Sequence, residues 1–276
     1  MKAALLQLNV SDDPLGNLPR TVEMVEQAAD MGAAFILTPE VTNCVSTNRA
    51  HQQSVLSLEQ DEPTLAAVRQ IASEKGVHIL IGSLALKTGE PDGRFANRSF
   101  LVCPRGDIIG RYDKIHMFDV AIDNTETYRE SSGYRPGERA VLARAEFAMV
   151  GMAICYDMRF PRLADALVTA GAQILTYPSA FSPVTGAAHW HSLLRARAIE
   201  AGAWVLAPAQ TGTHSSAQHK TRDTYGHSLA VNPWGEVVLD AGTAPGIYVF
   251  DLDLEKVAEA RRRIPSRENA RPFEAP

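Results

Sequence analysis

Short apolar segments alternate with helical segments along almost the whole chain, and this pattern limits what the chain can fold into. We expect a helix from Pro63 to a terminating Gly76 and others at 21–31, about 162–170 and 189–201. The expected strands span residues 3–10, 34–37, 77–86, 97–102, 107–112, 148–155, 173–177, 203–207, 228–231 and 237–239. Such alternation predicts an α/β fold.

Glycine and proline mark the expected element ends. Gly32 follows the helix at 21–31 in the position of a C′ glycine, and Pro63 suits a first helical turn. Two hairpins are expected, one around Cys103-Pro-Arg-Gly106 and one around Asn232-Pro-Trp-Gly235. Because hairpins occur together with helix-linked strands, the sheet should be mixed.

Composition favours one large domain. With 276 residues and 45% hydrophobic content, the chain can bury a sizeable core, so we expect a single domain over residues 1–276 with a polar tail at 265–276. A net charge of -5 argues against a nucleic-acid surface. The first ten residues lack a signal-peptide pattern, and no segment approaches membrane-spanning length. We therefore expect a cytoplasmic protein without a membrane partner.

The cysteines and histidines give no sign of a metal site. Three cysteines without C-x-x-C spacing argue against a disulfide framework or a four-thiolate zinc site and fit a reducing compartment. His189 and His191 are two residues apart, which would place them on different helix faces. The sequence therefore predicts neither a metal nor an organic cofactor, and a metallohydrolase is the weaker alternative.

Polar residues follow three of the expected strands. Glu40 follows the strand at 34–37, Lys114 follows the strand ending at Tyr112, and Cys155 ends the apolar run that begins at Met149. Strand ends form the ligand crevice of open α/β sheets, so the three side chains could converge. Taken singly, Cys155 could fill the core, and Glu40 and Lys114 could be solvated surface charges.

Together these residues resemble the signature segments of the nitrilase, or carbon–nitrogen hydrolase, superfamily. The three segments occur in order as Ile36-Leu-Thr-Pro-Glu40, Arg111-Tyr-Asp-Lys-Ile-His-Met-Phe-Asp119 and Gly151-Met-Ala-Ile-Cys-Tyr-Asp157. The resemblance covers nearly the whole chain. It implies a four-layer α-β-β-α sandwich, a homodimer and a catalytic triad of Glu40, Lys114 and Cys155.

The resemblance also implies a mechanism. Cys155 would attack an amide carbonyl to form a thioester, with Glu40 as general base and acid. Lys114 and the backbone N–H of Tyr156 would stabilise the oxyanion. Glu130, which matches the superfamily's second glutamate, would orient Lys114 or the substrate.

The downstream segments narrow the resemblance to the Nit branch, which comprises deaminated-glutathione amidases and ω-amidases of 2-oxo-acid amides. The segment Gln210-Thr-Gly-Thr-His214 followed by Thr224-Tyr-Gly-His-Ser228 is closer to the first type. Both substrates carry a carboxylate. Arg159 could bind it or could pair with Asp157, and the remaining candidate pocket residues, which could equally pack within a loop, are Phe181 and Thr185.

Several alternatives stay open. Within the superfamily, the substrate could be 2-oxoglutaramate, 2-oxosuccinamate, a nitrile or an N-carbamoyl amine. A cysteine–histidine hydrolase has no supporting motif. A catalytically silent binding protein would have no need of Glu40, Lys114 and Cys155 together.

Overall fold

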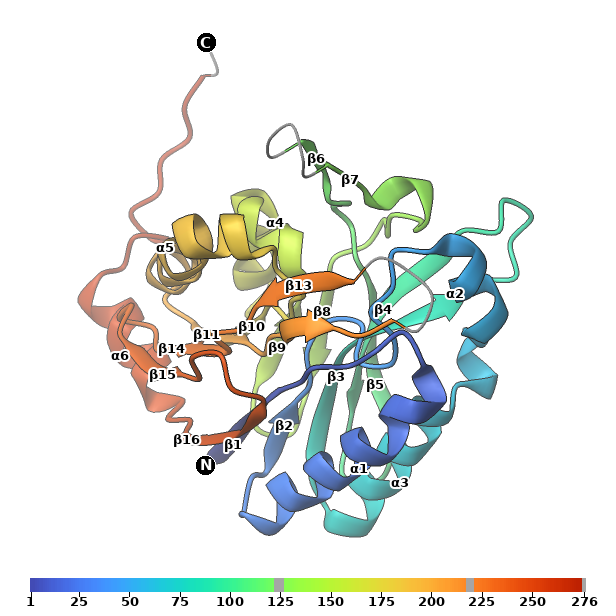
Figure 1. Cartoon of the computed structure of the whole chain (residues 1–276). Helices are drawn as coiled ribbons and strands as arrows, with labels where there is room; N and C mark the ends of the chain where they lie inside the picture. The colour runs from blue at the N-terminus through green and yellow to red at the C-terminus, as the bar shows by residue number, and fades with distance from the viewer. Residues whose placement is uncertain (122–126, 217–220, 275–276) are drawn as a thin grey trace.

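Two six-stranded sheets form the centre of the computed structural model, which describes residues 1–121, 127–216 and 221–274 (Figure 1). The first contains β1 (Lys2–Gln7), β2 (Phe35–Leu37), β3 (His78–Lys87), β4 (Phe95–Val102), β5 (Ile108–Asp113) and β16 (Gly246–Asp251). The second contains β8 (Val141–Arg144), β9 (Met149–Met152), β10 (Ile174–Thr176), β11 (Trp204–Ala207), β14 (Leu229–Val231) and β15 (Val237–Asp240). Their strand orders are β16-β1-β2-β3-β4-β5 and β15-β14-β11-β10-β9-β8.

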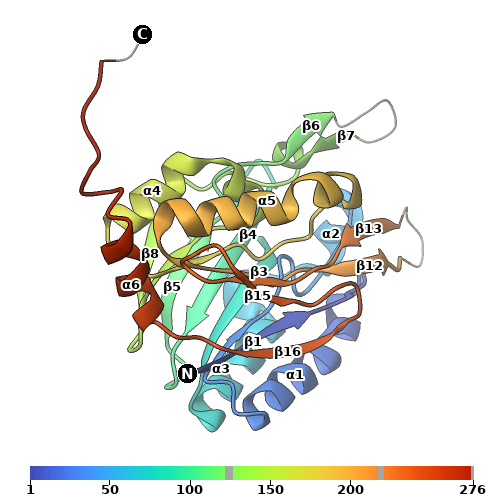
Figure 2. The same ribbon diagram turned by 90° about the vertical axis from the view of Figure 1, so that its left-hand side faces the viewer.

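Helices cover the outer face of each sheet (Figures 1 and 2). The first sheet packs against α1 (Pro14–Asp30) and α3 (Pro63–Lys75), and the second against α4 (Pro161–Thr169) and α5 (Pro183–Ala201). The layers therefore run α-β-β-α, which confirms the predicted sandwich. Smaller elements surround these layers: α2 (Arg49–Val55), α6 (Glu255–Arg263), the 3-10 segments η1 (Glu59–Asp61), η2 (Glu130–Ser132) and η3 (Cys155–Arg159), and the hairpins β6 (Asp119–Ala121) with β7 (Thr127–Arg129) and β12 (Thr211–His214) with β13 (Arg222–Tyr225).

The alternation of side chains along each strand supplies two adjacent cores. In β2, Phe35 and Leu37 belong to the core shared with the second sheet, whereas Ile36 belongs to the core beneath α1 and α3. All three are fully buried. Burial of each such side chain contributes about 1.5–3 kcal/mol. Both faces of the short strand are thus apolar, so its position between the layers is fixed by the hydrophobic effect.

Strand direction brings several strand ends to one edge. β2 runs parallel to β3, and β5 has the same direction because two antiparallel pairings separate it from β3. The chain segments that carry Glu40 and Lys114 therefore leave the sheet at the same edge. Gly82 permits the close approach there, since a Cβ at this position would lie 2.0 Å from the Thr38 carbonyl oxygen and 2.5 Å from Pro178 Cβ.

Most predicted elements are confirmed within a few residues. Gly76 ends α3 in the left-handed conformation, Gly32 follows α1 with φ +86°, and both predicted hairpins form. The predicted start of α1 was wrong. The helix begins at Pro14 and not at Thr21, and Asp13 caps it by accepting a hydrogen bond from the Leu15 amide.

Two other boundaries were also wrong. α5 begins at Pro183, so His189 lies inside the helix and not at its start. β9 ends at Met152, and Cys155 instead opens η3. The sequence had given no expectation for the edge strands β8 and β16, for α2 or for the two small hairpins, because these segments are short and carry weak periodicity.

The first residues of the C-terminal segment contact α4. Three arginines, Arg261 to Arg263, occupy the last turn of α6. Arg267 then forms an ion pair of 2.9 Å with Asp165, and Phe273 is 89% exposed. In the described ranges, none of the helices is long and apolar enough to cross a membrane.

Candidate active site

A cavity of about 890 Å³ contains most of the candidate residues. Its lining includes Glu40, Lys114, Glu130 and Cys155, which come from four separate loops of the chain. The strand ends predicted to converge do meet there. Tyr156, Phe181 and Thr185 also line the cavity.

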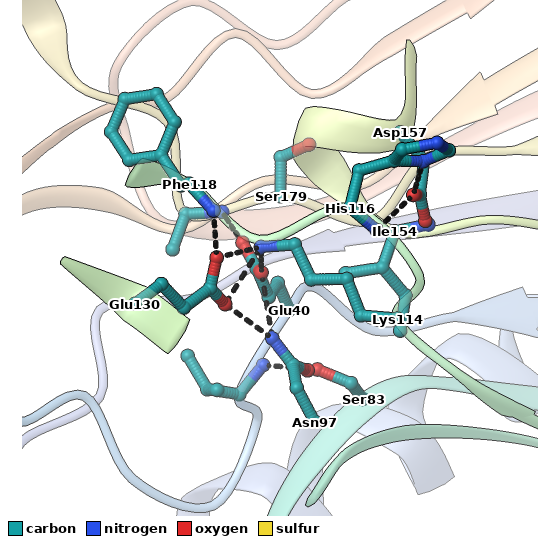
Figure 3. Close-up of polar contacts among 12 residues, drawn as sticks. Glu40, Ser83, Asn97, Lys114, His116, Phe118, Glu130, Ile154, Asp157 and Ser179 are labelled. Atoms are coloured by element: carbon teal, nitrogen blue, oxygen red, sulfur yellow. Dashed lines mark hydrogen bonds and ion pairs between the residues drawn. The ribbon is translucent and has the colours of Figure 1, made fainter. Parts of the chain in front are cut away.

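Lys114 lies between two carboxylates at the centre of this site (Figure 3). Its Nζ is 2.8 Å from Glu40 Oε1 and 2.9 Å from both carboxylate oxygens of Glu130. Asn97 Nδ2 donates to Glu40 Oε1 at 2.9 Å and to Glu130 Oε1 at 3.3 Å. The backbone amides of Phe118 and Ala180 complete the set, donating to Glu130 at 2.6 Å and to Glu40 at 2.7 Å. Every carboxylate oxygen is therefore held in place.

Asp157 ties the cysteine turn to the lysine segment. Its carboxylate accepts from the Ile154 amide at 2.9 Å and from the Tyr112 hydroxyl at 2.6 Å. It also contacts His116, with the backbone amide at 3.0 Å and Nδ1 at 2.6 Å. Because Asp157 is buried, these bonds position the two loops rigidly. His116 thus has a structural partner outside the cavity lining.

Cys155 adopts a strained backbone conformation. Its φ is +48°, in the left-handed region that residues other than glycine seldom occupy. The Cys155 amide donates to the Pro178 carbonyl at 3.0 Å, which holds the turn. Strain of this kind costs on the order of 1–3 kcal/mol and is concentrated at functional sites. The turn leaves the residue only 7% exposed but at the cavity wall.

The electrostatics of the thiol and the carboxylate are complementary. Burial, followed by the charge of Glu40, raises the pKa of the Cys155 thiol, and Lys114 only partly opposes this. Burial would also raise the pKa of Glu40, but the charge and hydrogen bond of Lys114, together with Arg222, bring it below the ordinary 4.5. The thiol therefore holds its proton at neutral pH. Glu40, whose charge contributes to that raised thiol pKa, is ionised and able to accept the proton.

Lys114 remains an ammonium despite being buried. Burial would lower its pKa, but Glu130 and Glu40 raise the pKa well above 10.5. A fixed cation next to the thiol can stabilise an oxyanion that forms there. The arrangement can thus supply a nucleophile, a base and a positive charge around one cavity.

Replacement of Lys114 by methionine should destabilise the fold by about 3–5 kcal/mol, because Glu40 and Glu130 would be left buried without their cation. Urea unfolding at pH 7 measures this loss. The loss in free energy of unfolding should shrink as the pH falls, since protonation of the carboxylates relieves the repulsion between them. Lys75→Met is the matched control, because Lys75 pairs with Asp30 on the surface and its loss should hardly change the free energy of unfolding. Equal losses in the two variants would contradict this interpretation of the cluster.

Arg159 is not among the described residues that line the cavity. Its guanidinium lies 5.5 Å from the ring centroid of Phe181 and 5.9 Å from that of Tyr156, and Nη2 is 3.2 Å from His189 Nδ1. Asp157, the other partner considered for it, instead accepts hydrogen bonds from the Ile154 amide and the Tyr112 hydroxyl. The structure therefore brings Phe181 and Thr185 to the cavity lining, whereas Arg159 lies near two lining residues without lining the cavity itself.

Asn97 and Arg222 are among the polar cavity residues that the sequence interpretation missed. Asn97 bridges both carboxylates, and Arg222 lines the cavity from β13. Asn97 begins an expected strand, where an inward-facing amide among apolar residues was a usable signal. Arg222 offered none, because the β12–β13 hairpin was not expected.

One group of side chains among the described residues has a spacing suitable for a metal ion. His191, His227 and Asp240 offer ligand atoms within 4.8 Å of one another. Both imidazoles hydrogen-bond to Asp240, at 2.9 Å from His191 Nε2 and 2.8 Å from His227 Nδ1. None of the three lines the cavity that contains Cys155. The prediction that catalysis needs no metal stays a prediction.

Fold and site together define the class of protein: a four-layer α/β sandwich with a cysteine, a lysine and two glutamates around one cavity. The family model for carbon-nitrogen hydrolases matches residues 2–262. The chain belongs to the carbon–nitrogen hydrolase family and is a hydrolase that acts on carbon–nitrogen bonds other than peptide bonds.

Individual relatives agree with this assignment. Deaminated glutathione amidase of Mus musculus is 38% identical over 274 residues, a match that covers 98% of this chain and 83% of the mouse protein. A probable hydrolase, nit2, of Schizosaccharomyces pombe is 39% identical and covers 95% of each chain. Among solved structures, Saccharomyces cerevisiae Nit3, a member of branch 10 of the nitrilase superfamily, has a TM-score of 0.82 at 28% identity and covers 96% of this chain and 94% of Nit3. The C. elegans NitFhit protein has a TM-score of 0.90 at 30% identity; the match covers 98% of this chain but 65% of that longer one.

Proposed function

We propose that the chain hydrolyses a linear amide through a thioester on Cys155, and that deaminated glutathione is its main substrate. The observation that carries the mechanism is geometric: Cys155 and Glu40 line one cavity, with the buried Lys114 ammonium 2.8 Å from that glutamate. An amide is a weak electrophile with a poor leaving group. Covalent catalysis divides its hydrolysis into two easier steps.

In the first step, Glu40 takes the thiol proton as Cys155 sulfur attacks the carbonyl carbon. Lys114 and the Tyr156 amide stabilise the oxyanion, and loss of one such donor typically costs about 3 kcal/mol. Collapse of the tetrahedral intermediate breaks the carbon–nitrogen bond, and Glu40 donates its proton to the leaving nitrogen. The products of this half are a thioester and a free amine or ammonia.

In the second step, Glu40 takes a proton from water, which attacks the thioester carbon. The carbon–sulfur bond then breaks, and the proton returns to the cysteine as the free acid leaves. Glu130 accepts two hydrogen bonds from Lys114 and so holds its ammonium in place during both steps. Glu130 is accordingly a positioning residue.

The size of the cavity and the names of the relatives support deaminated glutathione as the substrate. Deaminated glutathione is a tripeptide-sized molecule, and about 890 Å³ is toward the upper end of typical small-molecule pockets. The mouse relative bears this activity in its name. An ω-amidase acting on 2-oxoglutaramate or 2-oxosuccinamate is the second candidate, because these amides also carry a 2-oxo acid on the acyl side of the scissile bond.

Comparison of kcat/KM for deaminated glutathione and 2-oxoglutaramate, both followed as 2-oxoglutarate release, tests the assignment. We expect the higher value for deaminated glutathione. A higher value for 2-oxoglutaramate would favour the ω-amidase. A preference for a nitrile or an N-carbamoyl amine would reject both, and no turnover of any of them would favour a silent binding protein.

The remaining predictions extend this proposal. We propose one catalytic domain over residues 1–276, with 265–276 as its tail, and a homodimer formed through the face that carries α4 and α5. A cytoplasmic location also stays a prediction.

A further inference from the structure

Three partly exposed side chains outside the lining of the catalytic cavity direct their polar atoms at one another. His191 comes from the middle of α5, His227 from the connection between β13 and β14, and Asp240 from the end of β15. The elements α5 and β15 lie on the side of the molecule that faces the viewer in Figure 2. The reaction proposed above uses none of the three residues, so their grouping needs a separate explanation.

Two imidazoles and one carboxylate form a donor set that suits Zn²⁺. Their ligand atoms lie within 4.8 Å of one another, and the two histidine nitrogens are already 2.9 and 2.8 Å from the two oxygens of Asp240. Bonds of about 2.0–2.2 Å to a tetrahedral ion place neighbouring ligand atoms about 3.3 Å apart. Small side-chain rotations would therefore admit the ion at the centre of the group.

Hydrogen bonds outside the group hold two of the three ligands in place. His227 has φ +55°, in the left-handed region that residues other than glycine seldom occupy. Its amide donates to the Gly242 carbonyl at 2.6 Å, and its carbonyl accepts from the Trp190 indole at 2.8 Å. Asp240 Oδ1 accepts from the Gly242 amide at 2.9 Å. Outer hydrogen bonds of this kind orient metal ligands before the ion arrives.

Other histidine–carboxylate pairs of the structure show the contrast. His51 lies 3.6 Å from Asp12, and His116 lies 2.6 Å from Asp157. Within the described ranges, neither pair has a third histidine, cysteine or carboxylate close enough to complete a metal site. A pair of this kind needs no explanation beyond its hydrogen bond, whereas a group of three ligands from three separate elements has the composition of a cation site.

We propose that His191, His227 and Asp240 bind one Zn²⁺ ion and leave a coordination position for water. Their side chains are 24–38% exposed, so a hydrated ion can reach them. His191 binds through Nε2 and His227 through Nδ1, and the proton that each nitrogen donates to Asp240 moves to the other nitrogen of the same ring. Because the ligands come from three separate elements, the bound ion stabilises the fold.

Isothermal titration calorimetry with ZnCl₂ tests this site. The protein is the metal-free Cys155→Ala variant, since the cavity thiol could itself bind the ion. We expect one Zn²⁺ per chain. Adding His191→Gln or Asp240→Asn should weaken binding at least about 10- to 100-fold, because loss of even an outer partner of a metal ligand typically costs that much. His189→Gln is the matched control, since His189 lies on the same helix but contacts Arg159, and it should keep the affinity.

Two further measurements identify the ligands independently of the affinity. Co²⁺ in place of Zn²⁺ should give visible d–d bands without a thiolate-to-cobalt charge-transfer band, because the ligands are nitrogen and oxygen. Zn²⁺ should also raise the Tm of the Cys155→Ala protein but leave that of the added His191→Gln variant unchanged. Circular dichroism establishes that each variant is folded.

The absence of Zn²⁺ binding to the Cys155→Ala protein would overturn the proposal. Unchanged affinity after either His191→Gln or Asp240→Asn, or a thiolate band with Co²⁺, would also overturn it, because the protein would then hold an adventitious ion only. None of these measurements involves amide hydrolysis, so the proposed zinc site stands or fails independently of the proposed function.

Discussion

Replacement of Cys155 by alanine should lower kcat/KM for amide hydrolysis by about 10⁴-fold or more, because no other group can form the thioester. The cavity and the glutamate–lysine cluster would persist, since a thiol-to-methyl change is small. The measurement is release of 2-oxoglutarate from deaminated glutathione, with circular dichroism to establish that the variant is folded.

The two other thiols provide matched controls. Cys44 lines the same cavity, and burial raises the pKa of its thiol to about 12, whereas Cys103 lies in the turn after β4. Neither lies beside Glu40 and Lys114 in the hydrogen-bonded cluster. Cys44→Ala and Cys103→Ala should keep most of the activity. Substantial hydrolysis by Cys155→Ala, or an equal loss in either control, would reject Cys155 as the nucleophile.

Replacement of Glu40 by glutamine should lower kcat/KM by about 10²- to 10⁴-fold, because a neutral amide cannot take the thiol proton. Glutamine has nearly the same shape as glutamate, so the change removes the base with little change in volume. Glu62→Gln is the control. Glu62 is also a buried glutamate, but it caps α3 and does not line this cavity.

The pH dependence of kcat/KM tests the role of Glu40 as the base independently of the substitution. Glu40 acts as the ionised base, and its pKa lies below 4.5, so wild-type kcat/KM should stay constant as the pH falls and decline only below 4.5. On the alkaline side the plateau should extend past pH 9.0, because the pKa of the Cys155 thiol is raised. In Glu40→Gln the acid limb should disappear, and the residual rate should rise with pH as the thiol ionises. A wild-type acid limb above pH 4.5 would contradict this role for Glu40.

Local sequence signals were sufficient for the fold class and the central cluster. Strand length and glycine ends predicted an α/β fold with Glu40, Lys114 and Cys155 at strand ends. The resemblance of the segments around these residues to the carbon–nitrogen hydrolase superfamily implied the α-β-β-α sandwich. Strand direction explains why Glu40 and Lys114 converge as predicted, since β2 and β5 leave the first sheet at the same edge. The approach of these loops needs no information beyond the strand pattern and Gly82.

Local sequence signals could not predict which residues far apart in the chain contact one another. Arg222 reaches the cavity through a hairpin of weak periodicity, and Arg159 does not line the cavity although it is four residues from Cys155. The role of Asp157 depends on Tyr112 and His116, about forty residues earlier in the chain. Closeness to Cys155 in the sequence made Arg159 a candidate carboxylate ligand, whereas the arginine that lines the cavity, Arg222, was not predicted.

The most direct test of the account is mass spectrometry of the enzyme after acid quenching of its reactions with deaminated glutathione and with 2-oxoglutaramate. Glu40→Gln serves alongside the wild type, because loss of the base should also slow hydrolysis of the thioester. The account predicts the same mass gain from both amides, that of one 2-oxoglutaryl group, located on Cys155. An adduct on another residue, different adducts from the two amides, or no adduct in either form at any time would contradict it.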